Sequence, residues 1–105
     1  MAKEVIWSEQ AINDRKQILA YWIVRNQSKL YSIKLDALFR EAVSLLSQYP
    51  SIGKPTSIRN VRAKKVRDYF IFYQGKNQQI HILTIWDTRQ SPFGLRKKLK
   101  KGSKK

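Results

Sequence analysis

His81 is the only histidine of this sequence, and histidine is the residue type most often used for proton transfer in proteins. It lies in the apolar run 80–86, and an imidazole at such a place is able to transfer protons in general acid–base catalysis. If the run is a β-strand, alternation puts His81 on the same side as Leu83, Ile85 and Asp87. A histidine on a sheet with a satisfied hydrogen bond gives the same pattern. His81 therefore has either a role in proton transfer or a structural role in packing.

An acid and a base follow this run, because Asp87 and Arg89 flank Thr88. Cleavage of a phosphodiester needs a group that transfers a proton and cations that stabilise charge on the phosphate. Arg67 is a further candidate for that cation. The segment after the run also fits a turn in which Asp87 accepts hydrogen bonds from backbone N–H groups. The candidate catalytic residues are Arg67, His81, Asp87 and Arg89.

Five Lys and Arg residues lie close together between positions 59 and 67. On a strand, Arg62 and Lys64 share one side, while Arg59, Lys65 and Arg67 share the other. A sheet face lined by arginine suits phosphate binding. Charge also protects a solvent-exposed edge strand from pairing with another chain, so this alternative remains. The candidate nucleic-acid-binding residues are Arg59, Arg62, Lys64 and Lys65.

The net charge of +15 is concentrated in the second half of the chain. Residues 1–53 contain seven Lys/Arg and five Asp/Glu, and residues 54–105 contain fifteen and two. Seven of those fifteen lie in residues 96–105. A field of this sign attracts phosphate-bearing partners, although scattered lysines also serve solubility. We expect polyanionic partners.

The composition excludes several classes of protein. The sequence has no cysteine, no cluster of metal ligands, no phosphate-binding glycine loop and no Ser–His–Asp set, so we expect neither a metal nor a cofactor. Its apolar runs are too short to cross a membrane, and its N-terminal residues lack the apolar core of a signal peptide. We expect a cytoplasmic protein of one domain, with no membrane partner.

The elements that must position these residues follow from the apolar periodicity. Residues 3–7 fit a strand, Ser8 an N-cap, and apolar residues at steps of three and four predict helices over 9–26 and 31–49. The short link between the helices requires an antiparallel hairpin. Pro50 ends the second helix, and residues 50–55 are predicted as loop.

Period-two patterns then predict three strands over 58–66, 69–74 and 78–86, with the turn of the last hairpin at 75–77. The order is strand, helix, helix and three strands, so the fold class is α+β, with the helices packed on a small, mainly antiparallel sheet. We expect the folded domain to span 1–95. The basic segment 96–105 is expected to be disordered or in part a cloning remnant.

Four segments share their order and spacing with a known protein family. They are Ile6, Trp7 and Ser8 with Ala11 and Asp14; residues 18–23 with Asn26; residues 46–55; and Val61 and Arg62 followed by 69–73 and 80–85. Together these segments resemble the RelE/ParE superfamily of bacterial toxins. The resemblance implies the toxin of a type II toxin–antitoxin pair and a cognate antitoxin as partner.

The resemblance leaves the target open. RelE-like members cleave mRNA on the ribosome, whereas ParE-like members bind DNA gyrase and cleave nothing. The basic sheet and Arg89 favour a ribosome-dependent mRNA interferase, with ribosome and mRNA as partners, and this is our first prediction. Gyrase inhibition is the alternative. Two long helices favour it, as does Phe70, which occupies a position where catalytic RelE-like members commonly carry an arginine.

Overall fold

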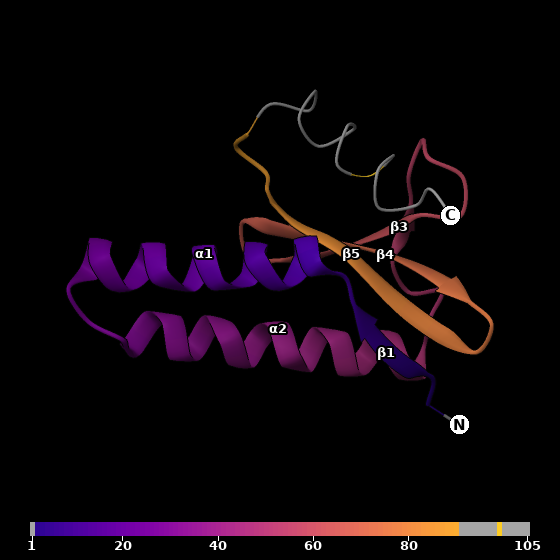
Figure 1. Cartoon of the computed structure of the whole chain (residues 1–105), viewed down its shortest axis with the longest axis horizontal. Helices are drawn as coiled ribbons and strands as arrows, with labels where there is room; N and C mark the ends of the chain where they lie inside the picture. Colours follow the sequence, from indigo (N-terminus) through magenta and orange to yellow (C-terminus); the bar gives the residue numbers. More distant parts are fainter. Residues whose placement is uncertain (1, 91–98, 100–105) are drawn as a thin grey trace.

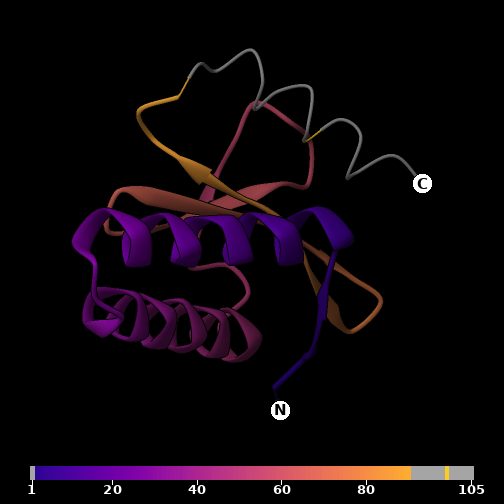
Figure 2. The same cartoon turned by 60° about the vertical axis from the view of Figure 1, so that its left-hand side comes forward.

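A computed structural model describes residues 2–90 and 99, and its elements follow the predicted order. These are β1 (Glu4–Trp7), α1 (Glu9–Asn26), α2 (Leu30–Gln48), β2 (Lys54–Pro55), β3 (Arg62–Val66), β4 (Tyr69–Lys76) and β5 (Gln79–Asp87). The five strands form one sheet in the order β1-β5-β4-β3-β2, in which only β1 and β5 run parallel. The helices form a hairpin along one face of the sheet (Figure 1; Figure 2), so the predicted α+β fold is confirmed.

Ser8 joins the first helix to the sheet. Its Oγ accepts a hydrogen bond from the Ala11 backbone N–H at 3.0 Å, which satisfies a free donor of the helix N-terminus. The same hydroxyl donates to the Leu83 carbonyl of β5 at 2.8 Å. At the other end, Gln27 adopts the left-handed conformation with φ 49° and stops α1. The predicted N-cap and the predicted end of the helix are confirmed.

The main core lies between the helices and the sheet. It is made by Leu35, Phe39, Ala42, Val43 and Leu46 of α2 against Tyr69, Ile71, Tyr73, Ile80, Ile82 and Ile85 of the sheet. Helix α1 contributes the buried Ala11 and a partly buried stripe that includes Ile18 and Trp22. Each fully buried aliphatic side chain contributes about 1.5–3 kcal/mol relative to an exposed one. These contacts hold α1 rigidly beside the end of β5.

A smaller apolar cluster covers the opposite face of the sheet. Val61, Phe72, Leu83, Trp86 and Leu99 are buried in it, with Phe70 packed against them. Leu99 belongs to the segment predicted as a tail, and the rest of that segment lies outside the described residues. Strand β5 is therefore covered on both of its faces.

Three predicted boundaries on the sheet are wrong. The strand predicted from residue 58 begins at Arg62, because the Val61 N–H bonds to the Ile58 carbonyl in a turn that places Asn60 at φ 66°. The predicted loop contains the two-residue strand β2, which pairs with β3. The last hairpin turns at Asn77 and Gln78, both with positive φ, as a two-residue hairpin requires.

A β-bulge in β5 changes which side chains share a face. Phe72 pairs with Thr84 and Tyr73 with Ile82, so Leu83 is an extra residue between the two pairs. Before the bulge, Ile80 and Ile82 face the helices; after it, Ile85 does, while Leu83 belongs to the opposite cluster. By alternation His81 lies on the face away from the helices, and Asp87 lies beside Tyr69 on the helix face. The prediction that His81, Ile85 and Asp87 share a side is wrong, because one inserted residue reverses the alternation.

Candidate functional site

A cleft opens where β5 ends beside α1. Its volume is about 330 Å³, and it is bounded by α1, the start of β4, and the end of β5 with the turn that follows. The residues that line it are Asp14, Gln17, Ile18, Tyr21, Tyr69, Ile85, Trp86, Asp87, Arg89 and Gln90. Two of the four predicted catalytic residues, Asp87 and Arg89, therefore meet in one site.

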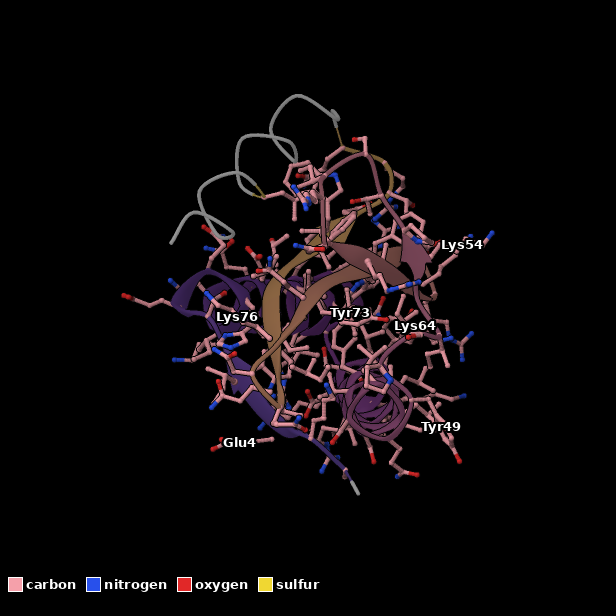
Figure 3. All side chains as sticks on the ribbon, turned by 90° about the vertical axis from the view of Figure 1, so that its right-hand side faces the viewer. Glu4, Tyr49, Lys54, Lys64, Tyr73 and Lys76 are labelled. Carbon is pink, nitrogen blue, oxygen red and sulfur yellow. The ribbon has the colours of Figure 1, made fainter. Side chains whose placement is uncertain are left out.

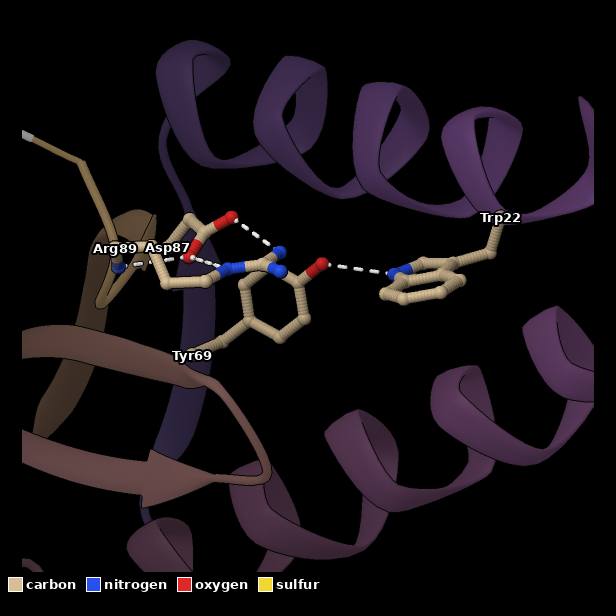
Figure 4. A network of polar contacts seen from close by, with 4 residues as sticks. All are labelled: Trp22, Tyr69, Asp87 and Arg89. Atoms are coloured by element: carbon tan, nitrogen blue, oxygen red, sulfur yellow. Dashed lines mark hydrogen bonds and ion pairs between the residues drawn. The ribbon is translucent and has the colours of Figure 1, made fainter. Parts of the chain in front are cut away.

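Asp87 and Arg89 form a closed ion pair at the mouth of this cleft (Figure 4). Arg89 Nε donates to Asp87 Oδ1 at 3.0 Å and Arg89 Nη2 donates to Oδ2 at 2.9 Å, while the Arg89 backbone N–H also bonds to Oδ1. The predicted turn capped by Asp87 is thus present as well. The hydrogen bonds from Arg89 lower the pKa of Asp87, and Asp87 in turn raises the pKa of Arg89. Both groups stay charged near neutral pH, so neither transfers a proton there.

Tyr69, which lines the cleft, is hydrogen-bonded to Trp22 of α1 (Figure 4). Trp22 Nε1 donates to Tyr69 Oη at 2.8 Å, and burial raises the pKa of the tyrosine. Trp22 is also packed edge-on against Tyr21 and Tyr31, with ring centroids 5.1 and 4.8 Å apart. Tyr69 is only 2% exposed. Its phenol stays protonated and ties β4 to the helix hairpin.

Asp14 lines the cleft but was not among the site residues predicted from the sequence. It lies on the apolar stripe of α1, between Ala11 and Ile18, and is 6% exposed. Its carboxylate accepts hydrogen bonds from the Thr84 hydroxyl and from the Ile85 backbone N–H at 3.2 Å, and Gln10 donates to it at 2.7 Å. The signal was present in the sequence, since an acid on an apolar stripe needs buried partners. Asp14 supplies acceptors to the backbone just after the bulge.

His81 lies away from the cleft. Its Nε2 is 3.1 Å from Gln79 Oε1, and the residue is half-buried on the face opposite the helices. Asp87 lies six positions further along β5, a distance of roughly 20 Å along an extended strand. The structure therefore does not bring His81 together with Asp87 and Arg89.

The four predicted nucleic-acid-binding residues lie in three different settings. Arg62 Nη1 donates to the carbonyls of Gly53 at 2.7 Å and Ser51 at 3.3 Å, so this guanidinium holds the loop before β2. Lys64 pairs with Ile71 on the helix side of the sheet and Lys65 with Phe70 on the other side, as their spacing predicted. Arg59 is exposed in the turn before β3 rather than on a strand.

Arg67 faces a different groove from the candidate catalytic pair. It occupies the turn between β3 and β4 with φ 57°. Together with Lys64 and Lys65 it lines a groove of about 220 Å³ whose other wall is α2, including Glu41. The four predicted catalytic residues thus lie in three places. Among the described residues, no group of three or more His, Asp and Glu side chains is arranged to hold a metal ion.

One family model covers most of the chain. The model of the family described as "ParE toxin of type II toxin-antitoxin system, parDE" matches residues 5–92. The chain belongs to the ParE toxin family. The resemblance to the RelE/ParE superfamily is thereby confirmed and narrowed to its ParE branch. A search of the curated proteins found no match.

A solved structure gives the same fold for this ParE-family chain. It is described as the chromosomal ParDE TA system from P. aeruginosa, and it superposes with a TM-score of 0.73 at 21% sequence identity. The match covers 82% of this chain and 96% of the other. Within the described ranges, no helix of this toxin is long and apolar enough to cross a membrane.

Proposed function

We propose that this ParE-family toxin, normally held by a cognate antitoxin, inhibits DNA gyrase by binding it and does not cleave RNA. The observation that carries the proposal is the dispersal of the candidate catalytic groups. Arg67, His81 and the Asp87–Arg89 pair lie in three separate places. Ribonucleolytic chemistry needs a proton-transfer group and a cation at the same phosphate.

The chemical state of the cleft supports binding rather than catalysis. Asp87 remains ionised and bonded to Arg89, and the Tyr69 phenol remains protonated. The chain's single histidine lies on the other face of the sheet. Phe70, at the position where catalytic relatives carry arginine, is packed against the cluster on that other face. Neither the Asp87–Arg89 pair nor the Tyr69 phenol is therefore suited to proton transfer near neutral pH.

The far end of the helix hairpin supports a protein target. Val24 is 76% exposed, Leu30 78% and Tyr21 48%, and all three lie close to the link between α1 and α2. Exposed apolar and aromatic side chains grouped in this way are typical of anchors in protein–protein interfaces. We assign the gyrase contact to this hairpin end.

A ribosome-dependent mRNA interferase is the second candidate function. The cleft itself favours it, because an exposed guanidinium (Arg89) and an aromatic ring (Tyr21) line a space of about 330 Å³. In this alternative Arg89 binds a phosphate and Tyr21 stacks on a base. The alternative requires Asp87 to release Arg89 when RNA binds.

Two assays on the same preparation separate the candidates. In gyrase supercoiling reactions we expect inhibition with trapped gyrase–DNA cleavage complexes, and in ribosomal translation with primer extension we expect uncut mRNA. The double variant Val24→Asp/Leu30→Asp should lose gyrase inhibition, whereas Ile12→Asp, which alters a 40% exposed residue elsewhere on α1, should keep it. Cleavage of mRNA only in the presence of ribosomes, with normal supercoiling, would establish the interferase instead.

A further inference from the structure

The sheet edge at β2 and β3 carries a group of cations that form no ion pair among the described residues, with Glu41 across the groove and Asp68 beyond Arg67 as the neighbouring acids. Residues 54–67 contain six Lys/Arg and no Asp/Glu. Arg62 is engaged with backbone carbonyls. We define the basic edge as the other five: Lys54, Arg59, Lys64, Lys65 and Arg67. Within the described part of the chain, the ion pairs join Arg15 and Arg40 to Asp36 and Arg89 to Asp87, so no residue of the basic edge has an ion-pair partner there.

The strand pairing explains why these cations gather on a narrow ridge. Strand β2 pairs with β3 only at Arg62 and Ala63, so from Lys64 onward the outer side of β3 has no neighbouring strand among residues 2–90. Lys64 and Lys65 project from opposite faces of this margin, and Arg67 follows at its tip. Figure 3 shows Lys54 and Lys64 on the same margin of the sheet. Lys54 of β2 and the three cations at the margin of β3 can therefore contact one extended partner that lies along this edge.

The chemistry of the ridge favours a phosphate backbone over unpaired bases. Recognition of single-stranded nucleic acid relies on aromatic side chains that stack on bases. Next to the basic edge, Tyr69, Ile71 and Tyr73 of β4 are at most 2% exposed, so the rings of Tyr69 and Tyr73 are not available for stacking. Phe70, which pairs with Lys65, is half-buried and packs against Phe72 with ring centroids 5.9 Å apart. Cations without stacking partners bind duplex DNA through its regularly spaced phosphates.

We propose that the basic edge binds the phosphate backbone of duplex DNA, so that the toxin contacts both gyrase and the DNA segment that gyrase holds. The assignment of gyrase as the carrier of that DNA rests on the proposed function; the phosphate contact itself does not. Lys64, Lys65 and Arg67 are its centre, because they are consecutive or nearly so along the unpaired margin.

The test measures binding of the full chain to a fluorescent duplex of about 30 base pairs by fluorescence anisotropy. The salt concentration is varied from about 0.05 to about 0.3 M, a range that brackets about 0.1 M, where each phosphate contact changes the affinity roughly tenfold. The variant Lys64→Gln/Lys65→Gln/Arg67→Gln should bind on the order of a hundredfold more weakly at 0.1 M salt and lose about two to three units of slope in the logarithmic salt dependence. The matched control Lys16→Gln/Lys29→Gln/Lys34→Gln removes the same charge from exposed positions of α1, of the N-cap of α2 and of α2 itself, and it keeps the C-terminal cations. It should change affinity and slope much less.

Equal losses in the two triple variants would overturn the inference, because binding would then follow net charge alone. Tighter binding of single-stranded RNA of the same length, lost in the edge variant only, would overturn it in favour of an RNA contact. A separate assay of toxin binding to gyrase subunits without DNA distinguishes DNA binding by the basic edge from gyrase inhibition. The edge variant should retain its binding to gyrase. If the toxin binds duplex DNA through the basic edge but does not bind gyrase, the proposed function is refuted and DNA binding by the basic edge is supported.

Discussion

The cleft at the end of β5 and the basic edge at β3 both carry charged side chains, but they use them differently. In the cleft, Asp87 is paired with Arg89, and the Asp14 carboxylate accepts hydrogen bonds from β5. At the basic edge, Lys64, Lys65 and Arg67 have no acid partner among the described residues. Paired and buried polar groups fix a local structure, whereas unpaired surface cations contribute little to folding and remain free for a partner.

This difference predicts opposite results when the charges are removed. Loss of a cleft group should lower the free energy of unfolding, because a buried donor or acceptor then lacks its partner. Neutralising a residue of the basic edge should leave stability within about 0.5 kcal/mol and change only binding. The four changes below test the comparison in order of decreasing expected effect.

Asp14→Ala should give the largest loss. The Thr84 hydroxyl and the Ile85 N–H would lose a charged acceptor in a buried place, which costs about 2–4 kcal/mol of unfolding free energy. Urea denaturation followed by circular dichroism measures it. Asn13→Ala, an exposed change one position earlier, is the control and should cost under about 0.5 kcal/mol. Equal stability of the two variants would show that Asp14 does not hold the bulge.

Tyr73→Phe tests the structural part of the sheet edge. Tyr73 Oη donates to the Pro50 carbonyl at 2.7 Å and accepts from the Gly53 N–H at 2.9 Å, and the residue is 1% exposed. Removal of this hydroxyl should cost about 1.5–2.5 kcal/mol. Tyr49→Phe, at a 58% exposed position, provides the control in the same urea titration. A loss under about 0.5 kcal/mol would mean that solvent replaces both bonds.

Tyr69→Phe should produce a smaller loss, about 1 kcal/mol, because Trp22 is only partly buried and its indole N–H can bond to water instead. The indole ¹H–¹⁵N resonance of Trp22 should shift in this variant and remain in place in Tyr21→Phe. The Tyr21 control keeps the Trp22–Tyr69 bond and the ring contact. An unchanged Trp22 resonance in Tyr69→Phe would contradict the bond.

Most of the fold followed from the sequence because its signals are local. Ser8 before an apolar period of three to four fixed the start of α1, and positions such as Leu35, Phe39 and Leu46 identified the buried stripe of α2. The division of Lys64 and Lys65 between two faces followed from strand alternation. Each of these rests on spacing within one element.

The arrangement of the candidate site could not be predicted from the sequence, because it depends on pairing between different strands. The bulge at Leu83 is set by the register of β4 against β5, and the run 80–86 is apolar on both faces, so no alternation marked the change. Arg62 appeared equivalent to Lys64 because the carbonyls of Ser51 and Gly53 are brought to it only when β2 pairs with β3. Asp87 and Arg89 were identified from the sequence, and Asp14, an acid on an apolar stripe, was a further local clue to the cleft that the arguments from residue type did not use.

Asp87→Asn should have the smallest effect, and its dependence on pH distinguishes it from the others. Hydrogen bonds from Arg89 hold the pKa of Asp87 below its ordinary value of 3.8, so the ionised form is favoured in the folded state. That contribution to stability is fully present above pH 3.8 and is lost as pH falls through the lowered folded pKa. The stability difference between wild type and Asp87→Asn should therefore be constant near neutral pH and shrink on acidification below that value. Thermal unfolding at roughly constant salt measures this difference. A range from about pH 2 to about pH 7 covers both the protonated and the ionised form of the Asp87 carboxylate. Asp68→Asn, which removes an exposed acid in the neighbouring turn, is the matched control for the loss of one carboxylate. A difference that grows toward low pH would mean that Arg89 does not stabilise the carboxylate, and the cleft would then resemble the basic edge in leaving its arginine free.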